Sequence, residues 1–202
     1  MELTQNPSVL ELVRKTAELT TPKEIVWIDG SEAQLDSLRK IAVETGELIK
    51  LNEEKLPGCY LNRSDVNDVA RVEGRTFICS RTREEAGPTN NWMDPDEMKA
   101  KLHEILRCAM AGGTMYVIPY SMGVIGSPFA KYGIEVTDSI YVVLNMAIMT
   151  RIGTKVLDAL GDSSDVILGV HSKVTLDPEN RYIVHFPEEN KIISVNSNYG
   201  GN

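Results

Sequence analysis

The sequence predicts a mixed α/β protein, in which helices flank a mixed sheet. Capping sequences for helices alternate along the chain with short apolar runs that are typical of buried strands. From residue 166 onward, strands joined by turn signals indicate an antiparallel end to the sheet. Of the 202 residues, 42% are apolar and 25% are charged. These are ordinary proportions for a globular protein that builds its own core.

The N-terminal part is expected to alternate between helices and strands. Asn6 followed by Pro7 is typical of a helix start, because Asn caps unpaired amides and Pro fits the first helical position. Ser31 and Gln34 form a capping box that opens a second helix. The expected elements are a helix from residue 7, a strand over 24–28, a helix over 31–46, a strand over 48–51, a helix over 64–71 and a strand over 76–80.

The second part begins with a polar loop over 81–93. Asp94 and Pro95 then start a helix, with Glu97 completing a second capping box, and Asp138 is expected to cap a later helix. The remaining elements are a helix over 94–110, a strand over 114–120, a loop over 121–131, a strand over 134–137, helices over 138–152 and 154–160, and strands over 166–171, 181–186 and 191–195. Because no repeat or linker interrupts this pattern, we expect one domain over residues 1–202.

Composition excludes several classes of protein. A net charge of −8 and a pI of about 5.0 argue against a nucleic-acid partner, which needs a basic face. The most apolar stretch, 134–152, contains charged residues, so no membrane partner is expected. Cys59, Cys79 and Cys108 are odd in number and lack C-x-x-C spacing, which predicts free structural thiols. With no secretory leader at the N-terminus, these features predict a cytoplasmic protein.

The common catalytic signatures are missing from the sequence. The loop with Gly123 and Gly126 lacks the phosphate-binding pattern G-x-x-x-x-G-K-[ST], and no G-x-G-x-x-G follows a strand. His103, His171 and His185 lack the spacing of metal ligands, so we expect ordinary core or surface histidines. No metal site is predicted in this chain.

Two features could bind a small anion. Arg71 lies just before a strand, where a guanidinium can project over the sheet edge and pair with a carboxylate or phosphate. Alone, such an arginine is more often used in a surface salt bridge. The tail with Tyr199, Gly200 and Gly201 follows a strand directly, and its glycines let backbone amides approach a ligand. The alternative for the tail is a frayed terminus.

Several segments together resemble the GTP-dependent phosphoenolpyruvate carboxykinases, and they occur in the order and spacing of that family. The run over 114–153 is the longest of them. The segments are DVARVE at 68–73, REEAGPTNNW at 83–92, TMYVIPYSMG at 114–123, GSP at 126–128, TDS at 137–139, YVV at 141–143, IMTR at 148–151 and YGGN at 199–202.

The resemblance implies the N-terminal lobe of a two-lobed enzyme. Such an enzyme interconverts oxaloacetate and GTP with phosphoenolpyruvate, CO2 and GDP, in gluconeogenesis and anaplerosis, with Mn²⁺ and Mg²⁺. By the resemblance, Arg71 binds the oxaloacetate or phosphoenolpyruvate anion, and Tyr199, Gly200 and Gly201 line the same pocket. No histidine of this chain falls on a metal-ligand position of the family. The nucleotide- and metal-binding C-terminal domain is expected to be absent, so no catalytic residue is assigned and the chain alone is expected to be inactive.

The sequence departs from the family pattern at three positions. Val124 and Ile140 stand where the family has proline, and Ala147 stands where it has arginine. The alternative function is a non-catalytic, stand-alone homologue that binds a small anion or regulates a full-length enzyme. A third hypothesis is another kind of nucleotide-binding α/β domain, and the missing glycine fingerprints count against it.

Overall fold

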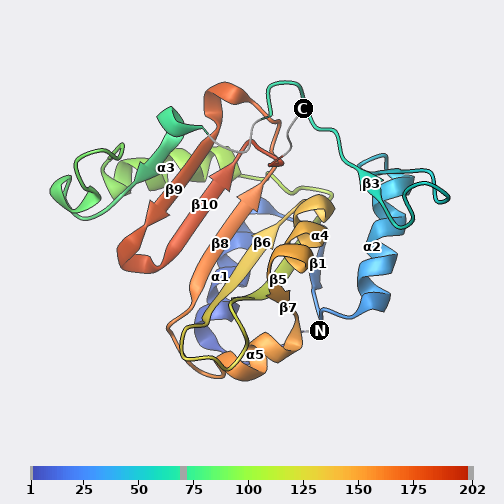
Figure 1. Cartoon of the computed structure of the whole chain (residues 1–202). Helices are drawn as coiled ribbons and strands as arrows, with labels where there is room; N and C mark the ends of the chain where they lie inside the picture. The colour runs from blue at the N-terminus through green and yellow to red at the C-terminus, as the bar shows by residue number, and fades with distance from the viewer. Residues whose placement is uncertain (1, 69–71, 200–202) are drawn as a thin grey trace.

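The computed structural model describes residues 2–68 and 72–199. Its main element is an eight-stranded mixed sheet in the order β1-β5-β6-β8-β10-β9-β4, with β7 paired to β5 (Figure 1). The strands are β1 (Glu24–Trp27), β4 (Thr76–Ile78), β5 (Thr114–Met122), β6 (Lys131–Thr137), β7 (Arg151–Ile152), β8 (Ile167–Ser172), β9 (Tyr182–Phe186) and β10 (Lys191–Val195). The predicted mixed sheet and its antiparallel end, β9 against β10, are confirmed.

Strand direction decides which loops meet. β6, β8 and β10 run parallel to one another, whereas β9 runs antiparallel to β10 and β4 runs parallel to β9. The carboxyl ends of β6, β8 and β10 therefore lie at the same edge of the sheet as the amino ends of β9 and β4. Segments that are distant in sequence are brought together at this edge.

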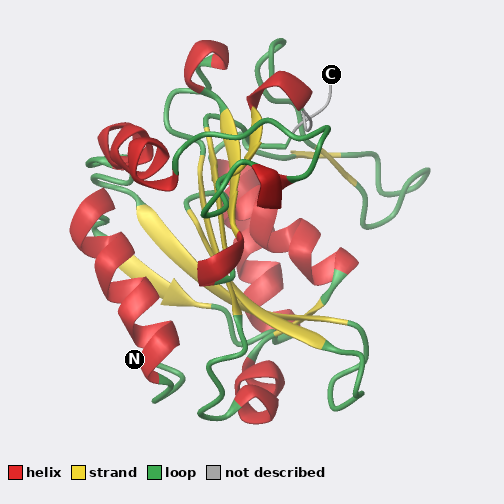
Figure 2. Cartoon of the chain, turned by 90° about the vertical axis from the view of Figure 1, so that its left-hand side faces the viewer, coloured by secondary structure: helices red, strands yellow, loops and turns green. Residues whose placement is uncertain are grey.

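Helices cover both faces of the sheet (Figure 2). Helix α1 (Pro7–Thr20) and helix α3 (Pro95–Leu106) pack on one face, and α2 (Glu32–Glu44) and α4 (Ile140–Met149) pack on the other, over β1 and β5. A short helix, α5 (Thr154–Leu160), follows β7. Among the described residues, no helix lies in front of β8, β10 and β9 in Figure 1, so the second face of these strands has no helix packed on it.

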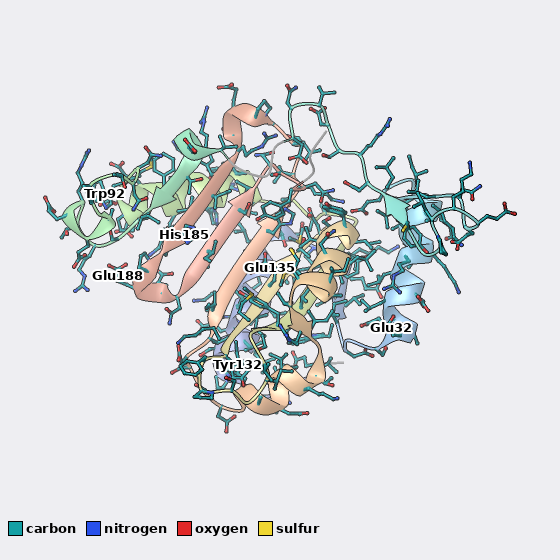
Figure 3. All side chains as sticks on the ribbon, viewed as in Figure 1. Glu32, Trp92, Tyr132, Glu135, His185 and Glu188 are labelled. Atoms are coloured by element: carbon teal, nitrogen blue, oxygen red, sulfur yellow. The ribbon has the colours of Figure 1, made fainter. Side chains whose placement is uncertain are left out.

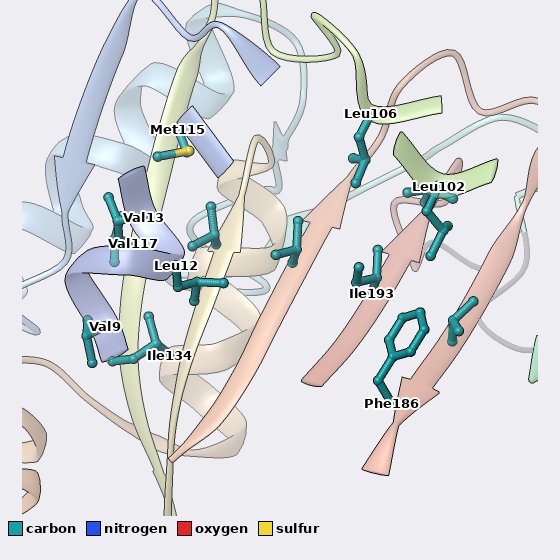
Figure 4. Packing of buried hydrophobic residues seen from close by; sticks show 14 of the residues in the cluster. Val9, Leu12, Val13, Leu102, Leu106, Met115, Val117, Ile134, Phe186 and Ile193 are labelled. Carbon is teal, nitrogen blue, oxygen red and sulfur yellow. The ribbon is translucent and has the colours of Figure 1, made fainter. Parts of the chain in front are cut away.

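The larger core lies between the sheet and the pair α1 and α3 (Figure 4). Val9 and Leu12 of α1 and Leu102 of α3 point onto Ile134 of β6 and Phe186 of β9, and all five are at most 6% exposed. The helices form because Asn6, Ser31 and Asp94 accept hydrogen bonds from first-turn amides, as the capping sequences predict. Within residues 2–68 and 72–199, no helix has the length and apolar character needed to cross a membrane.

The predicted helices over 64–71 and 94–110 are wrong in extent. Residues 64–68 are not helical, because the Asp65 side chain accepts a hydrogen bond from the Asn67 amide at 2.8 Å and forms a local turn instead. The rest of that predicted helix, 69–71, lies outside the described residues. Helix α3 ends at Leu106 rather than at 110, since Cys108 has a φ of 57° and its amide donates to the Leu19 carbonyl at 2.9 Å.

The predicted cap at Asp138 is also wrong. Ser139 caps α4, because the Asp138 carboxylate is occupied by the Ser172 hydroxyl at 2.7 Å and the Lys173 amide at 2.9 Å. The helix ends at Met149 and β7 follows, so the predicted helix to residue 152 was too long. Of the departures from the family pattern, Ile140 is the first residue of α4, a position that proline also suits.

The remaining elements are short. The predicted strand over 48–51 is present as β2 (Ile49–Lys50), but its partner β3 (Tyr60–Leu61) was not predicted, and together they form a separate two-stranded sheet. The loops of the described part contain the 3₁₀ turns η1 (Glu73–Arg75), η2 (Glu84–Ala86), η3 (Pro178–Asn180) and η4 (Pro187–Glu189). All three cysteines are free thiols, and burial raises the pKa of Cys79 to about 11.

Candidate functional site

Tyr199, the predicted site residue that the structure describes, lies where β6, β8 and β10 end. We call this region the carboxyl edge and define it as residues 67–68, 137–141, 171–177 and 196–199. In open α/β sheets, ligands bind outside the carboxyl ends of parallel strands, where loops from several strands converge. The carboxyl edge is lined by a connected set of polar side chains, which is uncommon for residues so deeply buried.

Asp68 and Arg181 join the two segments that the sequence singles out. Asp68 is 0% exposed and accepts hydrogen bonds from the Ser197 hydroxyl at 2.7 Å and from the Asn198 amide at 3.1 and 3.2 Å. Arg181 is 3% exposed, and its Nη2 lies 4.0 Å from Asp68 Oδ1. The same guanidinium donates to the Asn67 carbonyl at 2.6 Å. The chain just before 69–71 is therefore fixed to the chain just before 200–202.

Tyr199 is the one predicted site residue that the structure describes. Its ring stacks on the ring of His171, with centroids 4.8 Å apart and planes inclined by 28°. Burial, with a smaller effect of the Glu135 carboxyl, raises the pKa of the Tyr199 hydroxyl, so this side chain is a neutral phenol at physiological pH. Arg71, Gly200 and Gly201 lie outside the described residues, and their predicted roles stay predictions.

A second group of hydrogen bonds connects residue 198 to the start of α4. The Ser139 hydroxyl donates to Asn198 Oδ1 at 2.5 Å and lies 3.1 Å from Glu47 Oε1. Glu47 also accepts a hydrogen bond from the Tyr141 amide at 3.1 Å and lies 3.9 Å from the Lys173 ammonium. Residue 198 is thus fixed both to the loop before β4 and to the start of α4.

Glu135 of β6 lies on the face of the sheet opposite α1 and α3, next to the carboxyl edge (Figure 3). Its side chain crosses Gly169 of the neighbouring strand, where a Cβ atom would overlap Glu135 Oε2. Glycine at this position therefore makes room for the carboxyl. Burial raises the pKa of Glu135 to about 8 and, together with Glu135, raises that of Tyr120 to about 12. A carboxyl that is mostly protonated at neutral pH can donate a hydrogen bond.

The histidines and acidic residues do not form a metal centre in the part of the chain that is described. Over residues 2–68 and 72–199, no group of three or more His, Cys, Asp or Glu side chains could hold a metal ion. His171 is a satisfied core histidine, His185 is half-buried on β9 and His103 is exposed on α3. These residues therefore do not fit the Mn²⁺ and Mg²⁺ that the family resemblance implies.

Two hollows are not formed by these buried polar contacts, although Tyr141 of the carboxyl edge lines the second one. One of about 300 Å³ separates α1 from β10, and one of about 600 Å³ lies between α2, β3 and α4. Neither is lined by Tyr199 or His171. The candidate site therefore rests on the hydrogen-bonded carboxyl edge, and not on the shape of either hollow.

Sequence reasoning missed most of the residues that build this edge. It treated His171 as an ordinary core residue, gave Asp68 no role beyond the family segment and placed Arg181 only at the start of a strand. The available signal was weak: a charged or polar residue beside an apolar strand, repeated at the ends of β6, β8 and β10. Without the strand order, nothing in the sequence indicates that these residues meet.

Comparisons with known proteins agree with the resemblance. The family model of the phosphoenolpyruvate carboxykinase N-terminal domain matches residues 11–202. The chain is 53% identical over 199 residues to the phosphoenolpyruvate carboxykinase [GTP] of Anaeromyxobacter dehalogenans (strain 2CP-C), covering 98% of this chain and 33% of the relative. It is 49% identical over 209 residues to the protein of that name from Neocallimastix frontalis, covering 98% of this chain and 34% of the relative.

The chain thus spans about a third of the length of the curated relatives it matches. The matched relatives carry the name of the enzyme, and nothing in these comparisons supports the alternative of a non-catalytic homologue.

Proposed function

Because the chain belongs to the phosphoenolpyruvate carboxykinase N-terminal domain family, we propose that it forms the substrate-binding part of a GTP-dependent phosphoenolpyruvate carboxykinase. The whole enzyme would convert oxaloacetate and GTP to phosphoenolpyruvate, CO2 and GDP. In this proposal, residues 1–202 supply the pocket for the oxaloacetate or phosphoenolpyruvate anion. A further C-terminal part would supply the sites for GTP, Mn²⁺ and Mg²⁺.

The observation that carries this proposal is the link between Asp68 and Asn198. Arg71 follows Asp68 by three residues, and Gly200 follows Asn198 by two. Since Asp68 accepts hydrogen bonds from the Asn198 amide, the two predicted substrate-binding segments start from one fixed point. This supports a shared pocket for Arg71 and the glycines at the carboxyl edge.

The residues of the pocket suit a small anion with a carboxylate. An arginine binds a carboxylate through two parallel charge-assisted hydrogen bonds. Gly200 and Gly201 would let backbone amides approach the remaining oxygens, and Tyr199 would form a wall of the pocket. Bound GTP and metal ions supply phosphoryl transfer and charge neutralisation in this chemistry. The role of this chain is to bind and orient the substrate anion.

The first test is Arg71→Ala in the complete carboxykinase that carries this chain. Removing one partner of a shielded charged pair costs ~2–5 kcal/mol, which weakens phosphoenolpyruvate binding by about 30-fold to several thousand-fold. The measurement is the dissociation constant of phosphoenolpyruvate by titration calorimetry. Arg63→Ala is the matched control, because Arg63 is an exposed arginine of the same loop. An unchanged affinity in Arg71→Ala would leave Arg71 as a surface salt-bridge residue.

The second test uses the 202-residue chain alone. We expect no carboxykinase activity and phosphoenolpyruvate binding of millimolar order or weaker. In water an open arginine contact is worth only ~0–1 kcal/mol. The assay contains GTP, oxaloacetate and Mn²⁺, and metal-dependent turnover above the blank would contradict the expectation.

A further inference from the structure

His171 connects the sheet to the end of the tail, although neither the sequence nor the family resemblance gives it a role. It is 0% exposed on β8, and both of its ring nitrogens have partners. Nδ1 lies 2.7 Å from the Thr137 hydroxyl of β6, and Nε2 lies 2.6 Å from the Ser197 carbonyl oxygen. The ring therefore spans the gap between the last residue of β6 and the segment after β10.

The partners define which nitrogen carries the proton. A carbonyl oxygen only accepts hydrogen bonds, so Nε2 must carry a proton and donate to Ser197. The Thr137 oxygen already accepts from the Ser139 amide at 3.1 Å, which leaves its own hydrogen for Nδ1. Burial lowers the pKa of His171, in agreement with a neutral ring that is fixed in the Nε2–H tautomer. A side chain held at both nitrogens cannot rotate without breaking a buried hydrogen bond.

The segment that His171 holds has an unusual backbone. Tyr199 has a φ of 51°, a left-handed conformation that is unfavourable for a residue with a side chain. Its amide donates to the Ser197 hydroxyl at 3.0 Å, and Ser197 in turn donates to Asp68. His171 therefore contacts both ends of this turn, through the hydrogen bond to residue 197 and the ring stack on residue 199. Backbone outliers of this kind persist only where their surroundings hold them.

We propose that His171 is a positioning residue for substrate binding, which fixes Ser197 by its Nε2–H hydrogen bond and Tyr199 by its ring contact. This inference rests on the proposed function, because it assigns to His171 the orientation of a pocket wall that the substrate anion touches. His171 itself lies below the Tyr199 ring and contacts no substrate. We expect its contribution to appear in the KM for phosphoenolpyruvate, because loss of a contact made equally in the ground state and the transition state raises KM and leaves kcat unchanged.

Two substitutions in the complete carboxykinase separate the two contacts. His171→Phe keeps a flat ring under Tyr199 but removes both hydrogen bonds. His171→Gln keeps an amide donor for Ser197 and an acceptor for Thr137 but removes the ring. His185→Gln is the matched control, because His185 is a half-buried histidine on the same face of the sheet, away from the carboxyl edge (Figure 3). The thermal unfolding midpoint of each variant is measured beside its kinetics.

We expect His171→Phe to raise the KM for phosphoenolpyruvate by about 10-fold to 100-fold, the range for losing a buried hydrogen bond, with kcat changed by less than about threefold. His171→Gln should recover most of this loss, and His185→Gln should behave as wild type. A long-range ¹⁵N–¹H correlation spectrum of the 202-residue chain at neutral pH should show His171 as the Nε2–H tautomer.

Several results would overturn the inference. One is a KM for phosphoenolpyruvate that is unchanged in His171→Phe while Arg71→Ala weakens binding. A second is failure of both His171 variants to fold, which would assign the residue to stability alone. A third is an Nδ1–H tautomer in the spectrum. If Arg71→Ala leaves affinity unchanged, the proposed role of Arg71 in the substrate pocket has failed, whatever the His171 variants do.

Discussion

The two faces of β6, β8 and β10 carry side chains of different kinds, since one face is apolar and the other is polar. The face toward α1 and α3 presents Ile134, Val170 and Ile193 to an apolar core. The other face presents Glu135 and His171. Beyond the ends of the strands, the polar side chains of this face join the hydrogen-bonded residues of the carboxyl edge. Since side chains alternate along a strand, the same three strands serve both faces.

Under the proposed function, the apolar face would contribute stability, and the polar face would also contribute to substrate binding. The apolar face depends on burial, which is non-directional and tolerates small shifts of the backbone. The polar face depends on hydrogen bonds of fixed geometry, each of which leaves an unsatisfied buried group if its partner is lost. We therefore expect substitutions on the apolar face to change stability alone and substitutions on the polar face to change stability and substrate binding together.

The largest effect is expected from Asp68→Ala. This substitution leaves the 3%-exposed guanidinium of Arg181 without its carboxylate, which costs ~3–5 kcal/mol in free energy of unfolding. Urea denaturation of the 202-residue chain measures the loss. Asp165→Ala is the control, because Asp165 forms only an exposed contact of 3.7 Å with Lys131. A loss below about 1 kcal/mol in Asp68→Ala would show that the carboxyl edge is not held by this pair.

Leu102→Ala tests the apolar face. Leu102 is 1% exposed on α3, and truncating a buried leucine to alanine costs ~2–5 kcal/mol through lost burial and the cavity left behind. Ile148 lies near the end of α4 and is 82% exposed. Ile148→Ala should therefore change the free energy of unfolding by no more than about 0.5 kcal/mol. In the complete enzyme, Leu102→Ala should leave the KM for phosphoenolpyruvate unchanged, whereas Asp68→Ala should raise it. A KM that rises in both variants would remove the distinction between the two faces.

Glu135→Gln should change how stability depends on pH. The folded-state pKa of Glu135 is raised to about 8 from 4.5, so its stabilising contribution is complete below pH 4.5 and is lost as the pH rises toward 8. Between pH 5 and pH 8, we expect the free energy of unfolding of wild type to fall by roughly 1–3 kcal/mol more than that of Glu135→Gln. This loss is smaller than full desolvation would cause, because the Glu135 side chain is only partly buried.

The measurement is a pair of urea denaturation curves for each variant, at pH 5 and pH 8. Glu18→Gln on the surface of α1 is the control and should follow wild type. Equal pH dependence in wild type and Glu135→Gln would mean that the Glu135 carboxyl is ionised in the folded chain throughout this range.

The sequence was sufficient to predict the elements whose signals are local. Asn6, Ser31 and Asp94 cap helices as expected, and the strands over 181–186 and 191–195 match β9 and β10 closely. Errors occurred where a tertiary contact outweighs local preference. Asp138 would cap a helix in isolation, but its carboxylate binds Ser172 and Lys173 from another strand.

The candidate site was less predictable than the fold. Tyr199 was named from the glycine-containing tail and from the family resemblance. The structure shows its ring stacked on His171, and its role in binding a substrate stays a prediction. His171, Asp68 and Arg181 could not be identified, because the contacts of His171 and Asp68 with Ser197 and of Arg181 with Asn67 span 26, 129 and 114 residues and depend on the order β6-β8-β10. A single sequence contains no signal for that order.

The contacts at the carboxyl edge join residues that are far apart in sequence, and this separation determines when the edge can form during folding. Asn67 meets Arg181 across 114 residues, and Asp68 meets Asn198 across 130. Closing such long loops is entropically costly and comes after local contacts are made. We therefore expect the β9–β10 hairpin to be structured in the folding transition state and the contacts of Asp68 to form after it. The substrate pocket would then be the last part of the chain to assemble and the first to open.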